Sequence, residues 1–286
     1  MSKASAFIFF NGEYLPADAP VFRAGDRGVL YGDGLFETLR TYGGKPSLLE
    51  RHIARMSASA AALSLGTGPG LDTAREAIAR LLDLNGLRDA YIRITLTRGR
   101  HAGHLELDPP QHPSLLVVAQ PLRPLAPERY DPGSTAIVAS IRQNAASPLP
   151  RHKTLNYLAN LAAKTEARAC GADDAILLNT RGEVAEGASS NLFLVRTGRL
   201  ITPALGANIL PGVTRAEVLR IARGTGLTAE EMTVWPQELA SADEAFLTNS
   251  VAELVPLRSI DARPVGSGVP GPIFRQLLAG YHDVVI

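Results

Sequence analysis

The sequence is poor in residues that would support disulfide, zinc or membrane chemistry. Cys170 is the one cysteine among 286 residues, so neither an intramolecular disulfide nor a cysteine-based zinc site can form. No stretch approaches the ~18 apolar residues that cross a bilayer, and the apolar run near the amino end is too short for a signal-peptide core. We therefore expect a cytoplasmic protein without a membrane partner.

Net charge is also nearly absent. Lys and Arg together number 29 against 28 Asp and Glu, which leaves a formal charge of +1. This balance argues against nucleic-acid binding driven by overall charge, although it leaves room for a small local anion site. We expect no metal site, because His101 and His104 lie in a loop, where two histidines without a third ligand are usually solvated.

Lysine is scarce as well, which leaves few candidates for lysine chemistry. Of the 29 basic residues only four are lysines. We expect Lys3 at a frayed terminus, Lys45 in a hairpin turn and Lys164 on a charged helix face, all solvated. Lys153 follows a proline-bearing loop at the start of a helix predicted over 155–169, where a cation opposes the helix dipole. The plain alternative is that Lys153 is an ordinary charge at a helix start.

The length and the positions of the prolines indicate two domains. A chain of 286 residues corresponds to about two domains of ~150 residues each. Four prolines fall within 121–132, so we expect a linker there, an N-terminal domain over 1–120 and a C-terminal domain over 133–286. Strands and helices alternate without regular βαβ spacing. This predicts an α+β fold, with a smaller N-terminal α+β domain and a larger, strand-rich C-terminal domain.

The second predicted domain contains a carboxylate, small residues and a helix start that could bind one ligand. A strand and a turn bring Glu186 to a Gly-Ala-Ser-Ser loop, whose small residues would let a planar ligand approach the backbone. Thr214 opens a helix whose free N–H groups suit an anion, and Ser250 follows a predicted strand over 244–248. Together with Lys153, these parts suit pyridoxal 5'-phosphate, which needs a Schiff-base lysine, a carboxylate at its ring nitrogen and a phosphate site.

An ordered set of motifs runs through nearly the whole chain. It comprises Asn11-Gly12, Asp26-Arg27-Gly28, Tyr31-Gly32-Asp33-Gly34-Leu35-Phe36-Glu37, Glu50-Arg51-His52-Ile53-Ala54-Arg55, Lys153-Thr154-Leu155-Asn156, Glu186-Gly187, Pro211-Gly212-Val213-Thr214-Arg215 and Ser250-Val251-Ala252-Glu253. In this set the sequence resembles the class IV (fold-type IV) enzymes that depend on pyridoxal 5'-phosphate. That family includes D-amino-acid aminotransferases, branched-chain aminotransferases, (R)-selective amine transaminases and 4-amino-4-deoxychorismate lyases.

The resemblance implies a role for each matching residue. Lys153 matches the Schiff-base lysine, which also moves the substrate proton. The implied cofactor-binding residues are Arg55, Tyr157, Glu186, Val213, Thr214 and Ser250, and the implied substrate-binding residues are Tyr31, Phe36, Tyr91, Arg93 and Arg98. Alternation in the strand predicted over 90–97 independently puts Tyr91 and Arg93 on one face, although Arg93 could instead pair with a core carboxylate.

The same resemblance implies a transaminase that works on small molecules. Lys153-Thr154-Leu155-Asn156 lacks the glycine pair of the branched-chain pattern, which favours an amino donor that is a D-amino acid, or a primary amine, with a 2-keto acid as acceptor. The alternative is a lyase that releases 4-aminobenzoate and pyruvate. A branched-chain L-amino-acid aminotransferase and a non-catalytic protein that binds pyridoxal phosphate are further alternatives. The resemblance also implies a homodimer with its active site near the subunit interface.

Overall fold

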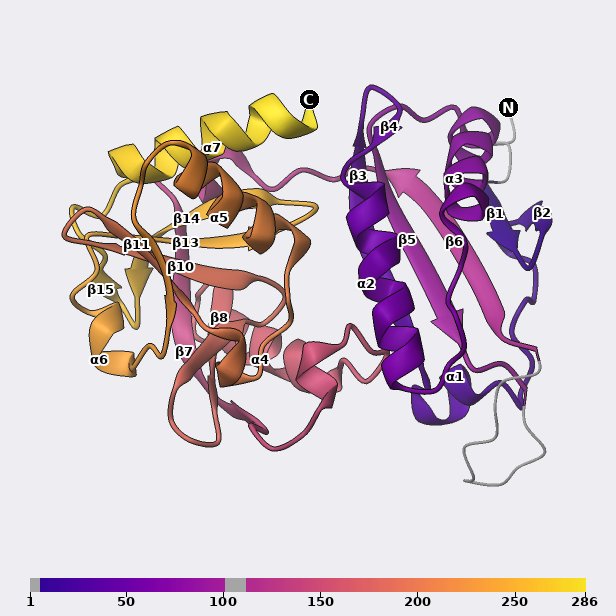
Figure 1. The fold of residues 1–286 in the computed structure, drawn as a ribbon, viewed down its shortest axis with the longest axis horizontal. Coiled ribbons are helices and arrows are strands. Elements are labelled where there is room, and N and C mark those ends of the chain that lie inside the picture. Colours follow the sequence, from indigo (N-terminus) through magenta and orange to yellow (C-terminus); the bar gives the residue numbers. More distant parts are fainter. Residues whose placement is uncertain (1–5, 101–111) are drawn as a thin grey trace. The chain divides into compact units, whose positions relative to one another are not determined.

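The chain folds into two compact units of mixed helices and strands. The computed structural model describes residues 6–100 and 112–286 (Figure 1). Unit 1 comprises Met1–Arg123 together with Lys153–Asn156, and unit 2 comprises Pro124–His152 and Tyr157–Ile286. The expected two-domain α+β class is confirmed. The predicted domains were continuous, whereas unit 1 takes in a four-residue segment from the middle of the chain.

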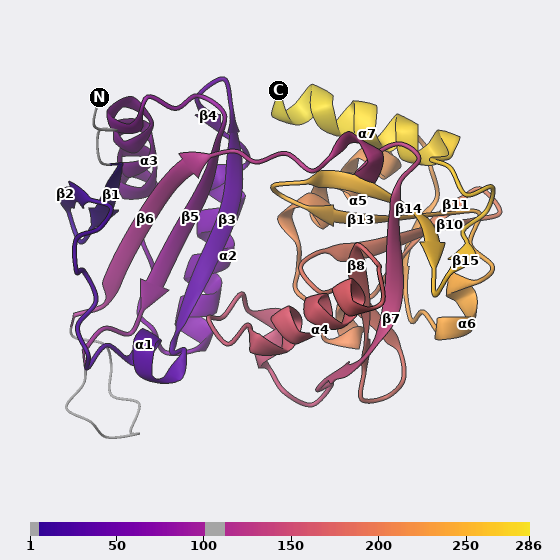
Figure 2. The same ribbon diagram turned by 180° about the vertical axis from the view of Figure 1, so that it is seen from behind.

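Unit 1 is an antiparallel sheet with two helices on one face. Its elements are β1 Phe7–Phe10, β2 Glu13–Pro16, α1 Arg27–Tyr31, β3 Gly34–Tyr42, β4 Lys45–Pro46, α2 Leu49–Ala62, α3 Leu71–Asn85, β5 Ala90–Thr97 and β6 Ser114–Pro121. The strand order is β2-β1-β6-β5-β3-β4. Helices α2 and α3 cover one face of this sheet, as the two opposite views show (Figures 1 and 2).

Alternation along β3 and β5 separates the two faces of this sheet. Leu39, Ile92 and Ile94 are fully buried and belong to the core cluster that includes residues of α2 and α3. Phe36 and Arg93 occupy the alternate positions, because Phe36 pairs with Thr95 and Thr38 with Arg93 across the two strands. The sheet therefore presents an aromatic and cationic face opposite its helical layer.

Unit 2 is built on a larger mixed sheet. Its elements are η1 Pro127–Arg129, β7 Ser134–Gln143, η2 Leu149–Arg151, α4 Leu158–Ala169, β8 Asp174–Asn179, β9 Val184–Gly187, β10 Asn191–Arg196, β11 Arg199–Pro203, η3 Leu205–Ala207, α5 Val213–Gly224, β12 Ala229–Met232, α6 Pro236–Leu239, β13 Glu244–Asn249, β14 Glu253–Ile260, β15 Arg263–Pro264 and α7 Pro272–Val285. The strand order is β12-β11-β10-β13-β14-β7-β8-β9, with β15 beside β14.

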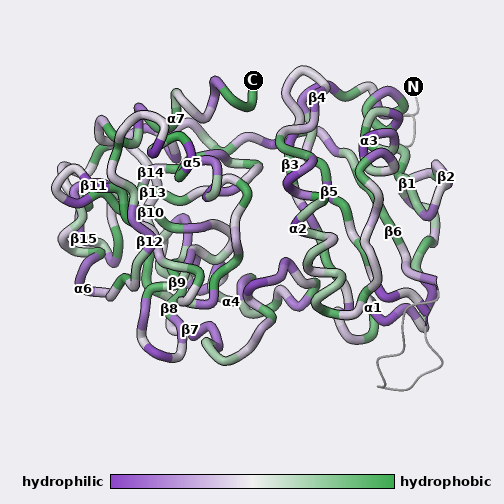
Figure 3. Tube along the Cα trace, viewed as in Figure 1, coloured by the Kyte–Doolittle hydropathy of each residue, from purple (hydrophilic) through white to green (hydrophobic). Residues whose placement is uncertain are grey.

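Aromatic packing joins helices α5 and α7 to this sheet. Phe193 of β10 and Phe246 of β13 stack with ring centroids 5.2 Å apart, and Phe274 of α7 meets Phe246 edge-on at 5.6 Å. Helix α7 alternates between hydrophobic and hydrophilic residues along its length (Figure 3). Its apolar face, which includes Leu277 and Tyr281, is buried in the same cluster.

Helix α4 is shorter than the sequence predicts. It begins at Leu158, not at residue 155. Leu158 and Leu161 are 78% and 55% exposed, while the smaller Ala163 and Ala167 pack against β7 and β8. The close approach of this helix to the sheet favours small side chains, so residue size outweighed hydrophobicity.

The described residues contain neither a helix that could span a membrane nor a side-chain cluster that could hold a metal ion. Within 6–100 and 112–286, no helix combines the length and apolar character needed to cross a membrane. The same residues contain no cluster of three or more His, Cys, Asp or Glu side chains placed to hold a metal ion. The predicted loop histidines His101 and His104 lie outside the described residues.

Candidate active site

Lys153 is held in unit 1 by backbone pairing with β3. The N–H of Phe36 donates to the carbonyl of Lys153 at 2.8 Å, and the N–H of Leu155 donates to the carbonyl of Gly34 at 2.9 Å. Lys153 thus lies on an extended segment five residues before α4, and our expectation of a lysine at a helix start is wrong. Its position is set by pairing with the sheet, not by a helix dipole.

Gly34 makes this pairing possible. A Cβ at Gly34 would meet the carbonyl oxygen of Leu96 at 2.5 Å and the side chain of Leu155 at 2.8 Å. Any larger residue would push the Lys153 segment away from β3. Asn156 closes the segment by donating from Nδ2 to the carbonyl of Gly32 at 3.0 Å.

The amine of Lys153 and the guanidinium of Arg93 share one aromatic ring. Lys153 Nζ lies 4.5 Å from the centroid of the Phe36 ring, and Arg93 Cζ lies 3.9 Å from the same centroid. Both are within the range of cation–π attraction. The structure therefore brings together three of the predicted site residues on the face of the sheet that lies opposite α2 and α3.

The remaining predicted substrate residues of unit 1 differ in their surroundings. Tyr91 precedes Arg93 by two positions on the same strand face. Tyr31 ends α1 with 45% of its surface exposed, and its ring lies 5.1 Å from the guanidinium carbon of Arg27. Of the two, Tyr91 lies on the face that carries Arg93 and Phe36.

Arg98 does not fit the substrate role that we expected for it. Its side chain is 4% exposed, and Nε donates to Asp33 at 2.8 Å. Nη1 and Nη2 donate to the carbonyls of Ser64 and Leu63 at 2.6 and 3.0 Å. With Arg27, Arg98 also lowers the pKa of Asp33, even though burial opposes that shift. Arg98 ties the end of β5 to the chain after α2, which is a structural role.

Arg55 reaches a buried carboxylate that the sequence analysis missed. Arg55 Nε donates to Glu37 Oε1 at 2.8 Å, and Nη2 donates to Oε2 at 2.6 Å. His52, one turn before Arg55 on α2, has Nδ1 2.7 Å from Glu37 Oε2. The i, i+3 spacing puts both side chains on the same face of the helix. The signal that could have found Glu37 was an acidic residue at an inward-facing position of a predicted strand.

Glu37 is ionised and His52 is neutral. Burial alone would raise the pKa of Glu37, but the charge of Arg55 and the hydrogen bonds from His52 and Arg55 outweigh it and lower the pKa to about 2. Burial lowers the pKa of His52, although Glu37 opposes this shift. Because an ionised carboxylate only accepts, His52 Nδ1 carries the proton. Glu37 and Arg55 thus form a charged pair with a neutral histidine beside it.

Glu186 lies at the end of β9 in unit 2, where three neutral N–H groups surround its carboxylate. It is 7% exposed. Gln143 Nε2 donates to Oε1 at 3.3 Å, Asn191 Nδ2 donates to Oε2 at 3.2 Å, and the N–H of Leu210 lies 3.3 and 3.2 Å from the two oxygens. These donors hold the carboxylate in one orientation, which suits a ligand with a protonated ring nitrogen.

The start of α5 offers hydroxyls and free N–H groups to an anion. Helix α5 runs over 12 residues from Val213, and no side chain caps its first turn. Thr214 Oγ1 and Ser250 Oγ lie 3.3 Å apart, and the buried Thr248 Oγ1 has no partner in the structure. The predicted phosphate residues Val213, Thr214 and Ser250 are thus gathered at a helix N-terminus that suits a phosphate.

Tyr157 donates its hydroxyl to the backbone of the turn after β9. Its OH lies 3.3 Å from the carbonyl oxygen of Ala188, which also accepts from Asn160 Nδ2 at 2.8 Å. The turn is tight, because a Cβ on Gly187 would collide with the Ser190 hydroxyl. Tyr157 therefore braces the Gly-Ala-Ser-Ser turn next to Glu186.

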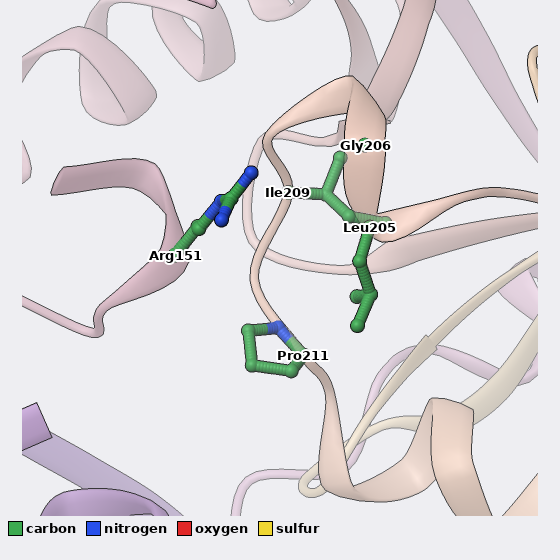
Figure 4. A pocket seen from close by; sticks show the side chains of 5 residues that line it. All are labelled: Arg151, Leu205, Gly206, Ile209 and Pro211. Atoms are coloured by element: carbon green, nitrogen blue, oxygen red, sulfur yellow. The ribbon is translucent and has the colours of Figure 1, made fainter. Parts of the chain in front are cut away.

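A small cavity opens beside the loop that follows η3. It measures about 180 Å³ and is lined by Arg151, Leu205, Gly206, Ile209 and Pro211. Arg151 lies across the cavity from Leu205 and Pro211 (Figure 4). Arg151 Nε donates to Asn208 Oδ1 at 2.9 Å, which fixes one wall of the cavity to the 208–210 loop.

These residues fit pyridoxal 5'-phosphate in their chemistry. Taken by itself, unit 1 contains an amine at Lys153. Unit 2, taken by itself, contains the carboxylate of Glu186 with its amide donors and the hydroxyls at the start of α5. The unpartnered hydroxyl of Thr248 and the absence of side-chain space at Gly187 and Gly212 are further features of a site made for a planar, phosphorylated ligand. Each unit thus contains groups of the kind that pyridoxal phosphate requires.

Comparison with known proteins defines the family. The model of amino-transferase class IV matches residues 34–260. A Methanocaldococcus jannaschii protein provisionally named a branched-chain-amino-acid aminotransferase is 36% identical, with 97% of this chain and 96% of that protein covered. The D-alanine aminotransferase of Bacillus licheniformis is 31% identical, with 98% and 97% covered. The chain belongs to the class IV aminotransferases.

Solved structures agree with this family. A branched-chain amino acid aminotransferase of T.th., complexed with N-(5'-phosphopyridoxyl)-L-glutamate, has a TM-score of 0.89 and 32% identity, over 99% of this chain and 94% of that chain. A Legionella pneumophila protein provisionally named 4-amino-4-deoxychorismate lyase has a TM-score of 0.87 and 29% identity, over 93% and 96%. The resemblance, the enzyme class and the cofactor expected from the sequence are confirmed: the protein is an aminotransferase that uses pyridoxal 5'-phosphate.

Proposed function

We propose that the enzyme transfers the amino group between a branched-chain L-amino acid and a 2-keto acid. The observation that carries this proposal is the Phe36 ring, which offers an apolar surface beside the Lys153 amine and has the Arg93 guanidinium against it. An apolar side chain suits the ring, and a carboxylate suits the guanidinium. The sequence alone favoured D-amino acids as substrates. We now prefer branched-chain L-amino acids, because a relative of 36% identity is named a branched-chain aminotransferase.

We assign the roles at the cofactor residue by residue. Lys153 would supply the amine that binds the aldehyde of the cofactor, and Glu186 would supply the carboxylate for its ring nitrogen. Arg55, Val213, Thr214 and Ser250 bind the phosphate, and Tyr157 supports the turn after Glu186. Glu37 holds the guanidinium of Arg55 by two parallel hydrogen bonds.

In the reaction the cofactor supplies an aldehyde and a ring that withdraws electrons when its nitrogen is protonated. The free amine of Lys153 would act as the base that removes the proton from the substrate carbon bearing the amine. Glu186 would supply the carboxylate partner of the ring nitrogen. Arg93 holds the substrate carboxylate, so that the proton faces Lys153.

Reduction of the holoenzyme with borohydride tests the central residue. We expect peptide mapping to find the pyridoxyl label on Lys153 and the visible absorbance to be lost in Lys153→Ala. Lys164→Ala is the matched control, because Lys164 pairs with Asp174 at 2.9 Å on the surface of α4. A label on any other residue would contradict the assignment.

A single-turnover panel tests the substrate. We expect L-leucine, L-isoleucine and L-valine to convert the bound cofactor to its amine form faster than D-alanine, D-glutamate or (R)-1-phenylethylamine. Faster conversion by D-alanine would favour the second candidate, a D-amino-acid aminotransferase, which the Bacillus licheniformis relative supports. Release of pyruvate from 4-amino-4-deoxychorismate would favour the lyase instead.

We also propose that the active enzyme is a homodimer. Val29 and Leu30 of the short helix α1 are 61% and 51% exposed, next to the predicted substrate residue Tyr31. A second subunit that covers these side chains would complete the surroundings of Tyr31. Light scattering on the purified protein should give twice the chain mass of 30.4 kDa, and a monomer with full activity would contradict this proposal.

A further inference from the structure

Two carboxamide side chains connect Glu186 to the loop before α5. Gln143, the last residue of β7, donates from Nε2 both to Glu186 Oε1 at 3.3 Å and to the carbonyl of Asn208 at 2.5 Å. Asn191, the first residue of β10, donates from Nδ2 both to Glu186 Oε2 at 3.2 Å and to the carbonyl of Leu210 at 3.0 Å. Each amide thus divides its two N–H bonds between the carboxylate and a loop carbonyl.

An amide suits both positions. Its nitrogen carries two N–H bonds and can serve two acceptors without adding a charge, whereas a carboxylate of the same shape has no proton to donate. The position of the Asn191 oxygen is also defined, because a Cβ at Gly212 would collide with Asn191 Oδ1. Gly212 is the residue that caps α5. Asn191 therefore contacts both the Glu186 carboxylate and the start of the predicted phosphate site.

The same loop supplies the third donor to Glu186. Because Gln143 and Asn191 hold the carbonyls of Asn208 and Leu210, the N–H of Leu210 is directed at both carboxylate oxygens. These three donors are neutral, so they stabilise a buried negative charge without contributing a positive charge of their own. The charge of Glu186 then remains effective toward a cationic partner.

We propose that Gln143 and Asn191 are positioning residues that keep Glu186 ionised and directed at the ring nitrogen of the cofactor. This inference rests on the proposed role of Glu186. Asn191 further sets the distance between that carboxylate and the start of α5, so that one side chain aligns the two ends of the cofactor site. Neither residue reacts, and their effect reaches the cofactor through Glu186 and the 208–212 backbone.

Isosteric variants and a cofactor analogue test the proposal. The probes are pyridoxal 5'-phosphate and its 1-deaza analogue, in which the ring nitrogen is replaced by C–H and can take no proton. In Gln143→Glu and Asn191→Asp we expect the affinity of the apoprotein for pyridoxal 5'-phosphate to fall by about tenfold or more, because a new carboxylate faces Glu186. Affinity for the deaza analogue should fall much less. Gln143→Leu removes the donors without adding charge. It should also lose more affinity for pyridoxal 5'-phosphate than for the deaza analogue, but the difference between the two losses should be smaller.

The control and the spectroscopic readout separate this role from a structural one. Gln237→Glu makes the same chemical change at an exposed site of unit 2 and should leave both affinities unchanged. In the ¹⁵N spectrum of holoenzyme loaded with ring-labelled cofactor, Gln143→Leu, which removes a donor to Glu186 without adding a charge, should shift the ring nitrogen toward its neutral form. Equal losses for both probes with an unchanged ¹⁵N shift would overturn the proposal. Its failure is distinguishable from failure of the proposed function, since borohydride labelling of Lys153 does not depend on Gln143 or Asn191.

Discussion

Two buried carboxylates, one in each unit, are stabilised in different ways. Glu37 in unit 1 accepts two parallel hydrogen bonds from the Arg55 guanidinium and one from neutral His52. Glu186 in unit 2 accepts from the side-chain amides of Gln143 and Asn191 and from the backbone of Leu210. Both are nearly inaccessible, at 1% and 7% exposure.

The difference indicates what each charge is for. A guanidinium cancels most of the charge of the carboxylate that it holds, so the Glu37 pair serves mainly to orient Arg55. Neutral amides leave the charge in place, so the carboxylate that they hold can act on a bound cation. On this proposal the same residue type is structural in unit 1 and acts on the cofactor in unit 2.

The largest expected effect is that of neutralising Glu186. Glu186→Gln keeps the shape of the side chain, so the cofactor should remain bound, while kcat falls by about 10³-fold because the ring nitrogen loses its counter-charge. Stopped-flow half-reactions with L-leucine measure this. Unchanged turnover would mean that the charge of Glu186, held by the neutral donors Gln143, Asn191 and Leu210, has no role in the reaction. The contrast with Glu37 would then be wrong.

Neutralising Glu37 should act on stability instead. Glu37→Gln leaves the buried Arg55 cation without its carboxylate, which should cost about 3 kcal/mol of unfolding free energy. Urea unfolding followed by circular dichroism should report this loss. Trp235, the one tryptophan of the chain, lies in unit 2, so its fluorescence transition should shift less.

Glu50 provides the matched control for this change. It pairs with Arg75 at 3.0 Å, but the two side chains are 65% and 47% exposed. Glu50→Gln should therefore change the unfolding free energy by less than about 0.5 kcal/mol. Equal losses at both sites would mean that burial does not distinguish them.

Acid should weaken unit 1 through the same cluster. The pKa of Glu37 is lowered to about 2, so its stabilisation is fully present above its ordinary value near 4.5 and is lost as pH falls from there toward 2. The pKa of His52 is lowered in the folded protein, so below pH 6.5 the unfolded state takes up a proton before the folded state does. The free energy of unfolding therefore falls further as the pH drops below 6.5. Urea unfolding between pH 7 and 3.5 should show falling stability, and Glu37→Gln should flatten the part below pH 4.5.

The smallest effect concerns the opposite face of the same sheet. Arg93→Met should raise the KM for a dicarboxylic keto acid by about tenfold, because a charge-assisted hydrogen bond is lost, with little change in stability. Arg40→Met is the matched control: its guanidinium lies over the ring of Tyr42 at 4.3 Å, further along β3. Similar changes in KM for both variants would argue against a specific carboxylate site at Arg93.

Much of the class of this enzyme was predictable from local sequence. Lys153, Glu186 and the Thr214 helix start carry chemistry that few residue types can provide, and their order along the chain identifies the family. The strand alternation that puts Tyr91 and Arg93 on one face follows from the period of a β-strand alone. Such signals depend on residues that are close in sequence.

Roles that depend on distant partners were not predictable. From the sequence Arg98 resembles a substrate residue, but in the structure its guanidinium donates to Asp33 and to the carbonyls of Leu63 and Ser64. Gln143 lies 43 positions from the Glu186 that it holds, and nothing in its neighbourhood marks it. A polar side chain reveals its function only through its acceptor, and chain folding chooses that acceptor.

The sequence by itself determined which groups we propose for the site, because an amine, a carboxylate and a helix start are properties of residues and short segments. Only the tertiary structure decided how each group is held: Lys153 by pairing with β3 and Glu186 by amides from two other strands. The physical reason is that hydrogen bonding and burial set the charge and direction of a side chain, and both arise from segments far apart in the chain.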